Sequence, residues 1–149
     1  MVSVIALDDA RHALPLADAL ADGDLRMVEV TFHTAAAIET ICQIAEHRPK
    51  MHVGAGRVLN KTQADAAKAT GAMFALQPGL DRAVLDSVSQ IGLPFAQGIM
   101  TPSDLQIALR ASCKLVKFFA AMAGGGLTIL KNIARSYLHT RIGSTRQAE

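Results

Sequence analysis

Short apolar runs recur along this chain at an almost constant interval, with helical patterns between them. The runs start roughly 20 to 25 residues apart, which is the length of a strand, a helix and two short loops. The predicted strands are Val2–Ala6, Met27–Thr31, Met51–Ala55, Met73–Gln77, Pro94–Gly98, Leu115–Phe119 and His139–Gly143. The predicted helices are Asp9–Ala21, Thr34–His47, Lys61–Thr70, Asp81–Gln90, Pro102–Ala111 and Gly125–Arg135. This alternation favours an α/β protein with a parallel sheet, either doubly wound or closed as a barrel.

Polar residues near the ends of several predicted strands favour the barrel, because the active site of a (β/α) barrel gathers at the C-terminal ends of its strands. A complete barrel has eight β-α units and usually at least ~200 residues, whereas this chain of 149 residues supplies about six and a half units. We therefore predict a single domain, residues 1–149, that forms a TIM-type (β/α) barrel incomplete at its C-terminal end. A doubly wound nucleotide-binding domain is disfavoured, because no Gly-x-Gly-x-x-Gly follows the first predicted strand.

The composition argues against several classes of protein. The net charge is only +2 and the basic residues are scattered, which argues against binding to nucleic acid. The apolar N-terminus meets Asp8 and Asp9 at once, unlike a signal peptide, and the uncharged stretch 118–130 is too short to span a bilayer. Cys42 and Cys113 lack the spacing of metal ligands and are expected to be free, buried thiols. These features predict a soluble cytoplasmic protein without a metal site.

Two ionisable residues lie inside apolar runs, where a charge is costly. Lys117 lies in Leu115–Phe119, and Glu29 lies in Met27–Thr31. Removal of a lysine from water favours the neutral amine, which is the nucleophile that condenses with ketones. The two residues together predict Schiff-base chemistry on Lys117 with Glu29 as the proton shuttle. The alternatives are that Lys117 is an edge residue whose ammonium reaches solvent, and that Glu29 is a surface charge at a strand end.

Four segments of the chain resemble, in order, the motifs of one enzyme family. They are Val28-Glu29-Val30-Thr31-Phe32-His33-Thr34, Val53-Gly54-Ala55-Gly56-Arg57-Val58-Leu59-Asn60, Gln77-Pro78-Gly79-Leu80 and Val116-Lys117-Phe118-Phe119. Through them the chain resembles the class I aldolases that cleave 2-keto-3-deoxy-6-phosphogluconate (KDPG) and 4-hydroxy-2-oxoglutarate (KHG). The resemblance covers nearly the whole chain, from Val2 to about Thr145. Four ordered motifs are far more specific than any one of them alone.

The resemblance implies a carbon–carbon lyase of the aldehyde-lyase class that needs no cofactor. Lys117 would form a Schiff base with the C2 ketone of KDPG or a related 2-oxo acid, and Glu29 would take up and return protons. The products would be pyruvate and an aldehyde. Pro78 could equally be only a turn residue, and at least one of Phe118 and Phe119 is expected in the core. The substrate-binding residues that the resemblance implies are His33, Arg57, Pro78, Phe119 and Thr145.

Two pocket positions depart together from the family's pattern. His33 stands where the family has arginine, and Arg57 stands where it has threonine. Both family residues help to hold the substrate carboxylate, and a neutral histidine offers one donor where a guanidinium offers a charged fork. We hypothesise that Arg57 restores the lost charge from the neighbouring strand. The alternative is that both positions drifted after the function was lost.

The last part of the chain departs further. The family's Cys-Pro-Thr-Gly-Gly loop corresponds to Gly143-Ser144-Thr145-Arg146-Gln147, which keeps the threonine but neither glycine. Because such loops cradle the substrate phosphate, a small non-phosphorylated 2-oxo acid becomes a more plausible substrate. The family's last helix and strand are missing, so we expect a truncated domain that forms a homo-oligomer, a trimer by resemblance. The alternative function is a catalytically impaired aldolase remnant with only a structural or subunit-association role.

Overall fold

The computed structural model describes residues 2–121, 123–137 and 140–144. In that part of the chain seven strands alternate with six α-helices, and a short 3-10 helix, Ala10–His12, precedes the first of them. The strands are β1 (Ser3–Ile5), β2 (Met27–Thr31), β3 (His52–Gly56), β4 (Phe74–Leu76), β5 (Phe95–Ile99), β6 (Leu115–Phe118) and β7 (Arg141–Ser144). The helices are α1 (Ala13–Asp22), α2 (Ala37–His47), α3 (Lys61–Ala69), α4 (Arg82–Gln90), α5 (Pro102–Arg110) and α6 (Gly126–Ser136).

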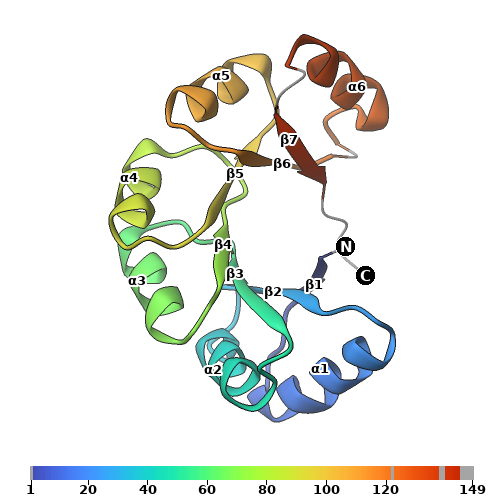
Figure 1. Cartoon of the computed structure of the whole chain (residues 1–149), viewed down its shortest axis with the longest axis vertical. Coiled ribbons are helices and arrows are strands. Elements are labelled where there is room, and N and C mark those ends of the chain that lie inside the picture. Colours follow the sequence, from blue (N-terminus) through green and yellow to red (C-terminus); the bar gives the residue numbers. More distant parts are fainter. Residues whose placement is uncertain (1, 122, 138–139, 145–149) are drawn as a thin grey trace.

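The seven strands form one parallel sheet in which each strand pairs with the next along the chain, from β1 to β7. The sheet is curled with the helices on its outer side, and within the described residues it stays open between β1 and β7 (Figure 1). A doubly wound sheet would reverse its strand order at a switch point. The sequential order therefore excludes that alternative. The predicted fold class, an α/β protein with an incomplete TIM-type barrel, is confirmed.

Three predicted elements differ from the observed ones by more than one residue at an end. The predicted helix Asp9–Ala21 divides into the 3-10 helix and α1, with the Asp9 carboxylate accepting a hydrogen bond from the Arg11 backbone N–H. The predicted helix Thr34–His47 begins only at Ala37, because the Thr34 hydroxyl donates to the Leu7 carbonyl and ties this loop to the end of β1. The predicted strand His139–Gly143 appears as β7, and His139 lies outside the described residues.

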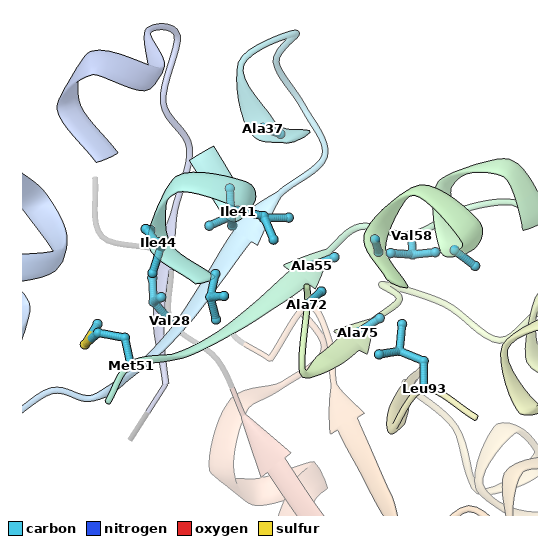
Figure 2. Packing of buried hydrophobic residues seen from close by; sticks show 14 of the residues in the cluster. Val28, Ala37, Ile41, Ile44, Met51, Ala55, Val58, Ala72, Ala75 and Leu93 are labelled. Carbon is cyan, nitrogen blue, oxygen red and sulfur yellow. The ribbon is translucent and has the colours of Figure 1, made fainter. Parts of the chain in front are cut away.

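The period of two in each strand separates the core from the inner face of the sheet. On β2, Val28 and Val30 are fully buried on the outer side, in a cluster that includes Ile41 and Ile44 of α2 (Figure 2). On β6, Val116 and Phe118 are fully buried in a second cluster, which they share with Leu105 of α5 and Ile133 of α6. Burial of each such side chain stabilises the fold by about 1.5–3 kcal/mol. The residues between these positions, Glu29 and Lys117, must therefore face the inner side.

The two cysteines correct one prediction. Both are free, as expected, but neither is fully buried. Cys42 lies on the exposed side of α2, where its thiol donates to the Glu46 carboxylate one helical turn away, at 3.4 Å. Cys113 lies between α5 and β6 and is only partly covered by the second core cluster. Within the described ranges, no helix combines the length and the apolar surface that a membrane span requires.

Candidate active site

A cavity of about 480 Å³ lies on the inner side of the sheet, at the C-terminal ends of the strands. Its volume is in the range of sites for small molecules. Six of the seven site residues predicted from sequence line this cavity: Glu29, His33, Arg57, Pro78, Lys117 and Phe119. The seventh, Thr145, lies outside the described residues. Residues far apart in the chain, such as Glu29 and Lys117 with a sequence separation of 88, thus meet in one place.

Lys117 of β6 and Glu29 of β2 form a buried ion pair in this cavity. The Lys117 Nζ lies 3.1 Å from Oε1 and 3.3 Å from Oε2 of Glu29. Lys117 is 7% exposed and Glu29 is 2% exposed. This burial excludes the two alternative interpretations, a lysine whose ammonium reaches solvent and a glutamate at the surface. At this distance a proton can pass directly from the amine to the carboxylate, which leaves a nucleophilic nitrogen.

The two adjacent phenylalanines divide between core and cavity. Phe118 is fully buried in the core, whereas Phe119 is 41% exposed and lines the cavity. The Lys117 Nζ lies 5.4 Å from the centroid of the Phe119 ring, within the range of a cation–π contact. Alternation along the end of β6 therefore places the amine and an aromatic ring on the same side. The ring gives the amine an apolar neighbour in addition to the Glu29 carboxylate.

His33 and Arg57, the two positions that depart together from the family's pattern, are in direct contact. The Arg57 Nη1 donates to the His33 Nδ1 over 2.7 Å. Because Nδ1 accepts this bond, the neutral ring carries its proton on Nε2. Arg57 follows the last residue of β3 and has a φ of 57°, in the left-handed region that non-glycine residues seldom adopt. Such conformations cost on the order of 1 kcal/mol and cluster at functional sites.

Pro78 lies at the cavity wall after β4, and the inner face of β5 makes room for it. A Cβ added at Gly98 would lie 2.0 Å from the Pro78 carbonyl oxygen and 2.6 Å from the Gly79 nitrogen. Only a residue without a side chain can therefore sit at position 98 while the Pro78-Gly79 backbone keeps its place. Pro78 belongs to the loop that follows β4 and also lines the cavity. The two interpretations of Pro78 from sequence, a turn residue and a pocket residue, are therefore both compatible with its position.

Thr31, Val4 and Ala6 also line the cavity, and sequence reasoning missed them as site residues. Alternation along β2 was a sufficient signal for Thr31, because it lies two residues after Glu29 on the same face. Val4 and Ala6 of the first strand region carry no chemical group that could have marked them. Among the residues that the structure describes, no group of three or more His, Cys, Asp or Glu side chains is placed to hold a metal ion.

Comparison with known proteins places this geometry in a family. Residues 1–146 match the family model described as KDPG and KHG aldolase. The chain is 37% identical over 145 residues to a 2-dehydro-3-deoxy-phosphogluconate aldolase of Haemophilus influenzae, covering 97% of this chain and 68% of that protein. It is 38% identical over 145 residues to the KHG/KDPG aldolase of Escherichia coli K12, with the same coverage.

A solved structure supports the same family assignment. The KDPG aldolase of Legionella pneumophila superposes with a TM-score of 0.93 at 33% identity, over 97% of this chain and 70% of that one. That structure holds pyruvate captured as a covalent carbinolamine intermediate. A carbinolamine is the first adduct of an amine and a ketone, so that protein performs amine-based covalent chemistry on a 2-oxo acid.

Proposed function

The chain belongs to the KDPG and KHG aldolase family, and we propose that it is a class I aldolase that works through a Schiff base on Lys117. It cleaves a 2-oxo acid to pyruvate and an aldehyde. The observation that carries the proposal is the buried pair between the Lys117 amine and the Glu29 carboxylate in a cavity of about 480 Å³. Nucleophile and proton acceptor are thereby already within hydrogen-bond reach.

The first half of the reaction builds the Schiff base. Glu29 accepts a proton from Lys117, and the neutral Nζ attacks the C2 carbonyl carbon to form a carbinolamine. Glu29 then returns a proton to the C2 hydroxyl, which leaves as water while the nitrogen lone pair forms the C=N bond. The resulting C2=N iminium is positively charged and lies next to C3. It can therefore accept the electrons of the C3–C4 bond when that bond breaks in the next step. The same carboxylate can act in both directions because, before substrate binds, it lies 3.1–3.3 Å from the nitrogen.

The second half breaks the carbon–carbon bond. Glu29 removes the proton of the C4 hydroxyl, the C3–C4 bond breaks, and its electrons flow into the iminium to give an enamine. The C4 fragment leaves as the aldehyde. Protonation of the enamine at C3 by Glu29 regenerates the iminium, and water releases pyruvate from Lys117. Phe119 covers one side of the amine and supports the exclusion of bulk water during these steps.

Arg57 is the proposed contact for the substrate carboxylate, with His33 holding its guanidinium in place. The hydrogen bond between them supports this assignment, because it accounts for the paired change at both positions. His33 also presents its Nε2–H as a second donor. Drift after loss of function would not by itself bring the two side chains into contact at 2.7 Å. Pro78 is proposed to line the same part of the site.

The substrate is proposed to be KDPG or a related 2-oxo acid. A structure of the KDPG aldolase of Zymomonas mobilis, 32% identical with a TM-score of 0.93 over 99% of this chain and 70% of that one, contains 3-phosphoglycerate. The preference for a non-phosphorylated acid stays a prediction, because Thr145 and its neighbours lie outside the described residues.

The assignment of residues 1–149 to one domain and a cytoplasmic location also stay predictions. Self-association as a homo-oligomer, a trimer by resemblance, likewise stays a prediction.

Borohydride trapping tests the proposed function. The folded protein is incubated with pyruvate, reduced, and measured by intact mass, alongside Lys117→Met. We expect one reduced pyruvate adduct on the wild type and none on the variant. An adduct on both proteins would place the Schiff base on another lysine. No adduct on the folded wild type would favour the alternative, an aldolase remnant with a structural role only.

A further inference from the structure

The inner face of β3 carries a glycine where the Glu29 carboxylate of β2 lies against it. A Cβ added at Gly56 would be 2.2 Å from Oε1 of Glu29, 2.7 Å from its Cγ and 2.8 Å from its Cδ. Oε1 is also the oxygen that lies 3.1 Å from the Lys117 Nζ. One carboxylate oxygen is therefore held between the bare backbone of Gly56 and the amine.

The backbone conformation does not demand a glycine at this position. Gly56 is the last residue of β3 and pairs in register with Thr31 of β2, and it is not among the residues with a positive φ. An alanine could adopt the same extended conformation, and glycine in a strand is normally a weakening choice. What position 56 lacks is space for a methyl group, and the atom that occupies that space belongs to the proposed proton shuttle.

We propose that Gly56 is a positioning residue for the aldol reaction: its missing side chain creates the space from which Glu29 reaches Lys117. The inference rests on the proposed role of Glu29 and extends it to a residue with no chemical group of its own. Gly56 does not touch the amine in this scheme. It acts only through the place that it leaves for the carboxylate.

The change Gly56→Ala displaces the carboxylate rather than the sheet. A contact of 2.2 Å must open to at least 3.0 Å, and the end of a flexible side chain yields more cheaply than a backbone. Gly98 is the contrasting case, because an added Cβ there meets the Pro78-Gly79 backbone. A shift of Oε1 by about 1 Å is enough to cost on the order of 100-fold in a proton transfer that depends on geometry.

The test separates proton transfer from Schiff-base formation. Enzyme and pyruvate are mixed in D₂O, and exchange of the pyruvate methyl protons is followed by NMR. Each exchange removes a C3 proton from the iminium and returns a deuteron to the enamine. For Gly56→Ala we expect exchange to fall by about 100-fold, while pyruvate still gives a borohydride-trapped adduct at saturation.

The matched control is Gly54→Ala on the same strand and face, whose Cβ meets the Phe74 ring at 2.2 Å. It should keep the wild-type exchange rate per trapped site.

A double-mutant cycle with Glu29→Ala keeps the test decisive even if Gly56→Ala folds poorly. Removing the carboxylate frees the space, so Gly56→Ala should change neither the melting temperature nor the residual exchange in the Glu29→Ala background. Equal losses in both backgrounds would overturn the inference, and so would wild-type exchange in Gly56→Ala alone. The proposed function fails separately, through the absence of a trapped adduct on the wild type.

Discussion

The Lys117 Nζ of β6 lies 3.1 Å from the Glu29 Oε1 of β2, so one buried ion pair joins two strands that are not neighbours in the sheet. The pair spans the inner side of the curled sheet, where both residues are almost completely covered. Such a pair cannot lose one member without leaving the other charge buried and unpaired. The proposed reaction uses this property, because each residue is the proton partner of the other until a ketone arrives.

Loss of the amine should affect stability as well as chemistry. We expect Lys117→Met to destabilise the fold by about 3–5 kcal/mol, because it leaves the Glu29 carboxylate buried and unpaired. Adding Glu29→Met removes that charge and should recover most of the lost free energy of unfolding. Urea denaturation of the two single variants and the double variant measures the effect. Equal stability of Lys117→Met and the wild type would show that the pair contributes no net stability.

Arg57→Thr should weaken the binding of pyruvate. A hydrogen bond to a charged group is worth about 1.5–3 kcal/mol, which corresponds to roughly a 10- to 150-fold rise in the dissociation constant. The constant is obtained from the concentration dependence of trapping. Unchanged affinity would rule out the idea that Arg57 compensates for His33.

The role of His33 can be separated from that of Arg57. His33→Asn places an amide oxygen near the position of Nδ1 and keeps an acceptor for the Arg57 Nη1, whereas His33→Leu removes the acceptor. We expect the asparagine variant to bind pyruvate more tightly than the leucine variant. In an Arg57→Thr background the difference should shrink, because the guanidinium that the acceptor holds is gone. A difference of the same size in both backgrounds would mean that His33 acts independently.

Gly98→Ala should destabilise the protein, because its methyl group would meet the Pro78 carbonyl at 2.0 Å and a backbone cannot easily retreat. Overpacking of this kind costs about 1–3 kcal/mol or more. Gly79→Ala is the control, since an added Cβ there has nothing within 4 Å and should change stability by less than about 0.5 kcal/mol. Thermal unfolding of both variants measures the contrast, and similar melting temperatures for the two would refute the packing argument.

Both thiols should react slowly with a disulfide reagent at neutral pH. The hydrogen bond to Glu46 raises the pKa of the Cys42 thiol, and burial raises the pKa of the Cys113 thiol. A raised pKa lowers the thiolate fraction at any given pH, so labelling should accelerate at a higher pH than it does for a free thiol. Glu46→Gln should speed the labelling of Cys42 and leave Cys113 unchanged. Site-resolved labelling followed by mass spectrometry reads both rates, and a slow Cys42 in that variant would contradict the assigned cause.

Local patterns predicted much of the fold and of the candidate site. The alternation of short apolar runs and helical segments located all seven strands, because period and spacing are properties of neighbouring residues. The sequence also placed Lys117 and Glu29 in apolar strands, and the structure shows that each lies between two core residues on the inner face of its strand. It failed at the start of α2, where the Thr34 hydroxyl binds a carbonyl at the end of β1, a contact that no local pattern encodes.

By itself, the sequence determined which side chains point inward, and motif resemblance indicated which of them carry chemistry. Tertiary structure alone decided which side chains are in contact. It brings Lys117 to Glu29 and Arg57 to His33, and it places the Glu29 carboxylate in the empty space over Gly56. These contacts depend on the register and curl of the sheet, which result from the packing of all strands and helices together. Side-chain direction is a local property with a period of two, whereas proximity across a curled sheet is a property of the whole assembly.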